Sequence, residues 1–249
     1  MHAELLLLAG LGLGFANTLA SSGSAISLPI LLGLGMAPEL ANGTNRVAVL
    51  AGALIATISF ARVGRIQWPI VTPMVAVSSA GALIGVWISE VLSPARMHLV
   101  IIAAECVALA LLVIRPSRWV EPSTVSPRVG PVQLVLVFLI GIWIGFIVLD
   151  GGTYLLVLLV LSARFDLLGA NAAKAAIMAG TSAVSLPVLA AGHHVEWASA
   201  SILAIGALAG GLAAARVARF PGAARWIYRL IVVILIGELA QLAFAGLRM

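Results

Sequence analysis

The chain has 249 residues and a formal net charge of +5; 62% of its residues are hydrophobic and only 9% are charged. A soluble domain carries about 25% charged residues, so this composition excludes a disordered chain, a disulfide scaffold and an ordinary soluble enzyme. Thirteen of the 14 basic residues are arginines, mostly at the ends of apolar runs. That pattern is typical of a polytopic helical membrane protein and not of a nucleic-acid binder.

Apolar runs long enough to cross a bilayer, which takes about 20 residues, recur along the chain. Two apolar regions, 4–36 and 131–163, are each interrupted by a short polar segment. A continuous helix of either length would be roughly 50 Å long, too long for a core of about 30 Å. We therefore expect each region to fold back at its break. The uninterrupted runs cover 43–61, 69–92, 95–114, 170–191, 197–218 and 223–247.

The sequence repeats itself at a shift of 129 residues. Gly12 then falls on Gly141, Trp68 falls on Trp197, and the two breaks coincide. This repeat predicts an N-terminal half over 1–115, a linker over 116–130 and a C-terminal half over 131–249. Residues 1–25 then correspond to an internal segment, and they also lack the positive n-region of a signal peptide.

The arginines discriminate between two arrangements of the halves. If each interrupted region crosses the membrane once, the halves are parallel and the arginines near the helix ends divide six against six. If each region enters and returns, the halves are inverted and the division is ten against two, a strong positive-inside bias. The expected fold is therefore an all-α polytopic membrane protein of two inverted repeats, each an interrupted hairpin followed by three transmembrane helices. We expect a cytoplasmic linker and periplasmic termini.

The two breaks mark the candidate substrate site. Exposed backbone groups at membrane depth are tolerated inside protein or around a wet cavity, and half-helix N-termini favour anions. The alternative is a packing hinge, in which small residues serve only close helix approach. The substrate-binding candidates at the two tips are Ser21, Ser22, Gly23 and Ser24, and Gly151, Gly152 and Thr153.

The next helix in each half begins with polar residues and carries one cation on an otherwise apolar helix. A charge in this position is costly and usually functional, although a cation that snorkels from the helix end is the alternative. Lys174 is the only lysine of the chain. The substrate-binding candidates on these helices are Asn42, Thr44, Asn45 and Arg46 in the first half, and Asn171 and Lys174 in the second.

Acidic residues within the apolar stretches are candidates for proton coupling. Asp150 lies at the second break, so it is the first candidate for a proton carrier; the alternative is a cap for the half-helix that follows. Glu105 and Glu238 lie deep in the last apolar run of each half. The sequence contains no P-loop, nucleophile elbow or zinc motif, so we expect no cofactor, no metal and no enzyme activity.

These motifs resemble the sulfite exporter TauE/SafE family, also called TSUP, over nearly the whole chain in two copies. The resemblance implies a membrane transporter for sulfur-containing anions such as sulfite, sulfonates or sulfoacetate. Two departures concern the substrate: the first tip is often a glycine cluster in the family, and Asn45 stands where a serine is common. The resemblance rests on Ser22-Gly23-Ser24, Ala41-Asn42-Gly43-Thr44-Asn45 and Gly64-Arg65-Ile66-Gln67-Trp68, and on Gly151-Gly152, Ala170-Asn171-Ala172-Ala173-Lys174 and Gly192 to Trp197.

The leading hypothesis is therefore a secondary transporter that exports or imports a small oxyanion across the inner membrane. Its expected partners are the anion and the lipid bilayer, with no nucleic acid, and a second copy of the chain is a further candidate. The alternatives are an anion channel, an intramembrane enzyme or a membrane subunit of a larger complex. Dependence of flux on a proton gradient separates the transporter from the channel.

Overall fold

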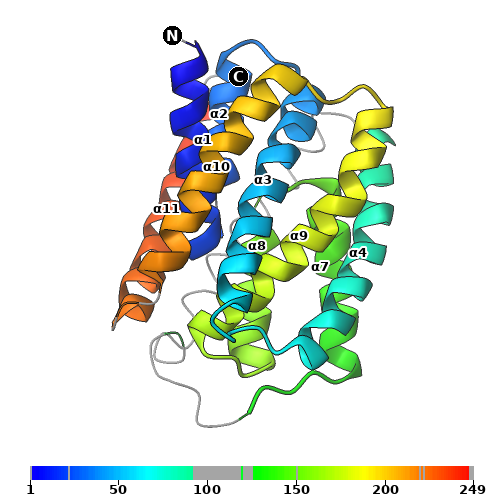
Figure 1. Cartoon of the computed structure of the whole chain (residues 1–249). Helices are drawn as coiled ribbons and strands as arrows, with labels where there is room; N and C mark the ends of the chain where they lie inside the picture. Colours follow the sequence, from blue (N-terminus) through cyan, green and yellow to red (C-terminus); the bar gives the residue numbers. More distant parts are fainter. Residues whose placement is uncertain are drawn as a thin grey trace.

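The computed structural model describes residues 2–21, 23–91, 119, 126–149, 151–218, 220 and 222–246, and within these ranges every regular element is a helix (Figure 1). The expected all-α class is confirmed. The predicted run 95–114 lies outside the described residues. Among the described helices, five are long and apolar enough to cross a membrane: α1 (His2–Leu19), α3 (Pro38–Ala61), α4 (Trp68–Val91), α9 (Leu167–Ala191) and α10 (Trp197–Val217).

The first interrupted region forms a helical hairpin. After α1 the chain breaks at residues 20–23, and α2 (Ser24–Gly33) follows. Gly23 lies against the Leu13 carbonyl, and the side chain of Ile26 lies beside Gly12. Later residues of α2 thus meet earlier residues of α1, so α2 runs back along the helix that precedes it.

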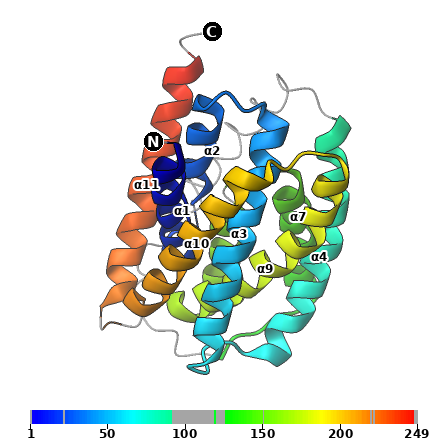
Figure 2. The ribbon, with the colours of Figure 1, turned by 45° about the horizontal axis from the view of Figure 1, so that its top comes forward.

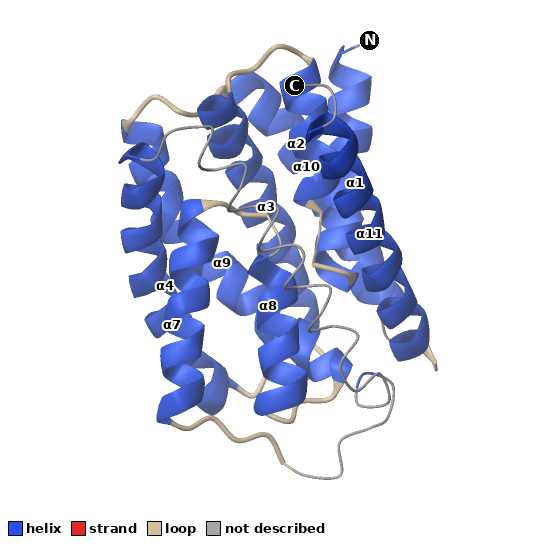
Figure 3. Ribbon diagram, turned by 180° about the vertical axis from the view of Figure 1, so that it is seen from behind, coloured by secondary structure: helices blue, strands red, loops and turns tan. Residues whose placement is uncertain are grey.

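The second interrupted region forms a matching hairpin. α7 (Pro131–Phe146) is followed by a break at residues 147–150, then by α8 (Gly151–Val157) and the π-helical segment η1 (Leu158–Ser162). Gln133 Nε2 donates to Ser162 Oγ over 3.1 Å, which brings the end of η1 back to the start of α7. Figure 3 shows α7 and α8 side by side.

Each half packs its first helix against a helix of the other half. α1 lies along α10, and α7 lies along α4. α3 and α9 pack against each other in the middle, where α3 also contacts α10 and α9 also contacts α4 (Figure 1). Corresponding helices of the two halves therefore make corresponding contacts.

Glycines allow these interlocked helices to approach closely, as is common in membrane proteins. A Cβ atom on Gly14 would overlap the Ala207 carbonyl, and one on Gly141 would overlap the Ser78 carbonyl. Ser78 and Ala207 are 129 residues apart, but Gly14 and Gly141 are 127 apart. The contacts thus pair Gly141 with Gly14, whereas the single shift read from the sequence paired it with Gly12.

The two chain ends lie at the same end of the bundle. α1 begins there and α11 (Ala223–Gly246) ends there (Figure 2). The α3–α4 turn, the starts of α7 and α9, and the α10–α11 turn lie at the opposite end (Figures 1 and 2). The described arginines next to these turns are Arg62, Arg65, Arg128, Arg164, Arg216, Arg225 and Arg229.

We expect Gly14→Ala to destabilise the protein by about 1–3 kcal/mol, because the added methyl group would overlap the Ala207 carbonyl and force α1 away from α10. The measurement is the thermal unfolding midpoint in detergent. Gly33→Ala is the matched control, since a Cβ there meets no atom within 4 Å. Equal midpoints for the two variants would contradict the close approach of α1 and α10.

Candidate functional site

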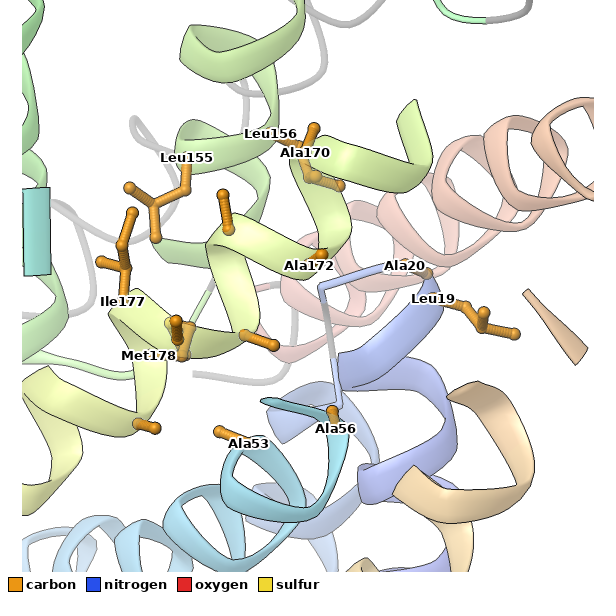
Figure 4. Packing of buried hydrophobic residues seen from close by; sticks show 14 of the residues in the cluster. Leu19, Ala20, Ala53, Ala56, Leu155, Leu156, Ala170, Ala172, Ile177 and Met178 are labelled. Carbon is orange, nitrogen blue, oxygen red and sulfur yellow. The ribbon is translucent and has the colours of Figure 1, made fainter. Parts of the chain in front are cut away.

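The tips of the two hairpins meet inside the protein. A Cβ atom built on Gly152 would lie 2.8 Å from the Cβ of Ser21, so the two breaks touch with no room for a further side chain. Ser21 and Gly152 are both buried. Figure 4 shows Leu19 and Ala20 at the end of α1, close to the helices that carry Ala56 and Ala172. The structure therefore brings together residues from both predicted tips.

Lys174 joins the first tip from α9. Its side chain is only 1% exposed, so it does not snorkel to the surface. The three hydrogens of the ammonium group are directed at four oxygens of the protein. Nζ donates to Asn17 O, Ser21 Oγ and Asn171 Oδ1 over 2.8 Å each and to Thr18 O over 3.3 Å.

Ser21 has an unusual backbone conformation for the contact that it makes. Its φ angle is +75°, in the left-handed region that costs a residue with a side chain about 1–2 kcal/mol and favours glycine. Its hydroxyl oxygen accepts from the Lys174 ammonium. Since that oxygen accepts, the hydroxyl hydrogen is left to donate. Ser21 thus offers a donor at the point where the two tips meet.

Arg46 performs the equivalent role for the second tip. Its guanidinium is fully buried and donates from Nη1 to Ile144 O over 2.6 Å and from Nη2 to Gly145 O over 3.0 Å. These carbonyls belong to the last turn of α7. At a shift of 127 residues they correspond to the carbonyls of Asn17 and Thr18. Each half therefore supplies one cation to the broken helix of the other half.

These contacts satisfy a definite physical need. The last carbonyls of a helix have no partner within the helix, and the C-terminal end carries a partial negative charge. A buried carbonyl left without a partner costs about 1–3 kcal/mol. Arg46 and Lys174 are charged donors that satisfy these carbonyls just before each break. They hold the ends of α7 and α1 in place.

Two further candidates form a separate polar cluster. Asn45 Oδ1 accepts from Ser27 Oγ over 2.5 Å, and Asn45 Nδ2 donates to Ser24 Oγ over 3.0 Å. All three side chains are buried. The cluster fixes the start of α2 against α3, so Ser24 and Asn45 lie together but not in the cluster around Lys174.

Thr44 lies away from the tips, beside the α9–α10 loop. Its Oγ1 accepts from the Glu196 amide over 2.9 Å, and a Cβ on Gly43 would overlap the His194 carbonyl. Hydrogen bonds from Ser199 and Ala198 to the Glu196 carboxylate lower the pKa of that group below its ordinary value and cap α10. Thr44 therefore anchors a loop.

The remaining candidates are buried, unpartnered or outside the described residues. Asn42 Oδ1 and Thr153 Oγ1 are buried with no hydrogen-bond partner. Ser22, Asp150 and Glu105 lie outside the described residues, and only the helical backbone is described at Glu238. In the described part of the chain no group of three His, Cys, Asp or Glu side chains is placed to hold a metal ion.

Sequence reasoning missed three residues of these clusters. Asn17 and Thr18 contribute backbone carbonyls, which any residue type would supply, so the sequence carries no signal for them. Ser27 follows Ser24 by one helical turn, and that spacing was an available signal. A small cavity of about 10 Å³, close to the room that one water molecule needs, adjoins this cluster; its lining is Asn17, Thr18, Ala53, Ala56, Lys174, Ala175 and Met178.

Comparison with known proteins agrees with this architecture. Residues 6–241 match the family model described as sulfite exporter TauE/SafE. The chain belongs to this family. It is 29% identical over 213 residues to "Probable membrane transporter protein ORF9" of Sinorhizobium sp, which covers 84% of this chain and 80% of that protein. It is 23% identical over 198 residues to "Probable membrane transporter protein YfcA" of Escherichia coli K12, which covers 79% and 73%.

No solved structure matches the fold. The family match and these relatives make the chain a multi-pass membrane protein of a transporter family. The expected membership of the TauE/SafE family is therefore confirmed.

We expect Asn45→Ala to destabilise the protein by about 1–3 kcal/mol, because it leaves the buried hydroxyls of Ser24 and Ser27 without their shared partner. Thr57→Ala is the matched control: on the same helix it removes only a local bond to Ala53 O. The measurement is the difference between the two unfolding midpoints in detergent. A smaller loss for Asn45→Ala than for Thr57→Ala would contradict the cluster.

Proposed function

We propose that the protein is a secondary transporter that exports a small sulfur-containing oxyanion, such as sulfite, a sulfonate or sulfoacetate, through a site where the two hairpin tips meet. The observation that carries this proposal is the cluster in which Ser21 of the first tip contacts Gly152 of the second and accepts a hydrogen bond from Lys174. The family match and the names of the relatives support transport as the activity.

The charge of the interior supports an anionic substrate. Among the buried polar side chains of the described residues there are two cations, Arg46 and Lys174, and no carboxylate. Both cations bind backbone carbonyls, so we propose that they attract the anion through their charge. Direct donors would come from Ser21, from the neighbouring Ser22, Gly23 and Ser24, and from the N-terminal amides around Gly151, Gly152 and Thr153.

We further propose that the two halves are inverted repeats that move against each other for alternating access. In Figure 1 α1 descends while α7 ascends, and α3 descends while α9 ascends. Both interrupted regions fold back, which is the condition under which the arginines divide ten against two. The positive-inside rule then favours a cytoplasmic 116–130 linker and periplasmic termini.

The topology has a direct test. A fluorescent reporter that matures only in the cytoplasm, fused after Met249, should give no signal, because we propose that both termini are periplasmic. The same reporter inserted in the linker between 116 and 130 should be bright and serves as the control for expression. Bright cells from the C-terminal fusion would overturn the proposed orientation.

The substrate is tested by flux in proteoliposomes with sulfite, thiosulfate, sulfoacetate, taurine and sulfate. We expect transport of at least one sulfur oxyanion. We also expect about tenfold weaker apparent affinity in Ser21→Ala, Arg46→Ala and Lys174→Ala, as for the loss of a bond or charge worth roughly 1.5–3 kcal/mol. Ser201→Ala, which removes only a local bond to Trp197 O, is the control. No flux of any member of the panel would contradict the proposal.

Asp150 is the proposed proton carrier, since it follows directly on the second tip. Asp150→Asn keeps the shape and the capacity to cap a helix but cannot titrate. We expect this variant to bind the anion yet lose its response to an imposed pH gradient. Full gradient-driven transport would eliminate Asp150 as the carrier. Flux that ignores the gradient in the unmodified protein would identify a channel.

A further inference from the structure

The oxygens around Lys174 have the composition of a cation site. Two are backbone carbonyls in the last turn of a broken helix, one is a hydroxyl and one is an amide oxygen. Carbonyls of unwound or terminated half-helices are the groups that coordinate monovalent cations in other secondary transporters. Within the described residues no buried carboxylate neutralises the ammonium group. The cation is held by oxygen dipoles alone.

The conformation of Ser21 indicates that this arrangement is specific. Glycine would adopt a φ angle of +75° without strain, yet the position carries a residue whose hydroxyl binds the ammonium. Strain of this kind persists where the surrounding contacts determine the conformation. Asn171, one helical turn before Lys174, turns its carbonyl oxygen to the same nitrogen and donates with its amide to Leu167 O. Both side chains thus complete the oxygen cage.

We propose that Asn17 O, Thr18 O, Ser21 Oγ and Asn171 Oδ1 form a monovalent-cation site whose occupant is the tethered ammonium group of Lys174. The charge that a free ion would bring to the end of α1 is then part of the chain. This goes beyond the transported anion, because it concerns which cation the folded protein requires. The unmodified protein needs no free sodium ion at this site, whereas Lys174→Ala leaves the site open to a small cation.

The first experiment measures thermal unfolding of the purified full-length protein in detergent at constant ionic strength. In Lys174→Ala, methylammonium chloride should raise the unfolding midpoint by about 3 °C or more over choline chloride, whose cation is too large for the cage. The unmodified protein should show equal midpoints in methylammonium, sodium and choline salts. No difference in Lys174→Ala, or a sodium-dependent midpoint in the unmodified protein, would overturn the proposal.

Matched variants test whether the rescue depends on the cage. Adding Ser21→Gly to Lys174→Ala relieves the strained backbone but removes one oxygen, and adding Asn171→Ala removes another. Each double variant should lose most of the methylammonium shift. A shift of the same size in both double variants would mean that the salt acts elsewhere. Because the readout is stability, the result stands whichever anion is transported.

A second measurement does not depend on the folding of a variant. Lys174 is the only lysine, so labelling with [15Nζ]lysine gives one side-chain resonance from the unmodified protein. We expect an ammonium signal whose hydrogens exchange slowly with water, because all three are engaged with protein oxygens. A neutral amine, or an ammonium group in free exchange with solvent, would overturn the assignment.

Discussion

The fold depends on the backbone carbonyls that two broken helices leave exposed inside the membrane. The lipid core holds no water to bind them, so the protein must supply donors. It does so with one cation from each half: Lys174 binds the end of α1, and Arg46 binds the end of α7. Each cation comes from the opposite half, so neither hairpin is satisfied by its own repeat. The two halves therefore depend on each other for their broken helices.

Close packing makes this exchange possible. The glycines of α1 lie against backbone carbonyls of α10, and those of α7 lie against carbonyls of α4. With the outer helices interlocked in this way, α3 and α9 occupy the centre and carry their cations to the tips. Small residues at the interface and charged residues at the centre thus serve one purpose. They bring two polar breaks together inside an apolar protein.

Much of this architecture was predictable because its causes are local in the sequence. Apolar runs fixed the helices, and polar interruptions fixed the breaks to within a residue or two. The site was only partly predictable. Asn17 and Thr18 participate through carbonyls that carry no residue signature, and the exchange of cations between halves appears only in three dimensions. Small-residue repeats also hid a change of shift from 129 to 127 between the outer helices.

The two halves have the same plan but different chemistry at their cations. A guanidinium binds two carbonyls through two separate nitrogens, whereas an ammonium gathers four oxygens around one atom. The first arrangement fixes a plane and leaves Arg46 Nε without a partner. The second encloses a point charge and draws a side chain from the tip itself. Because Ser21 belongs to both the oxygen cage and the meeting point of the tips, any movement of the first hairpin must change the surroundings of Lys174. The second hairpin is held by backbone alone, so it is tied to Arg46 at positions where the identity of the side chain does not matter.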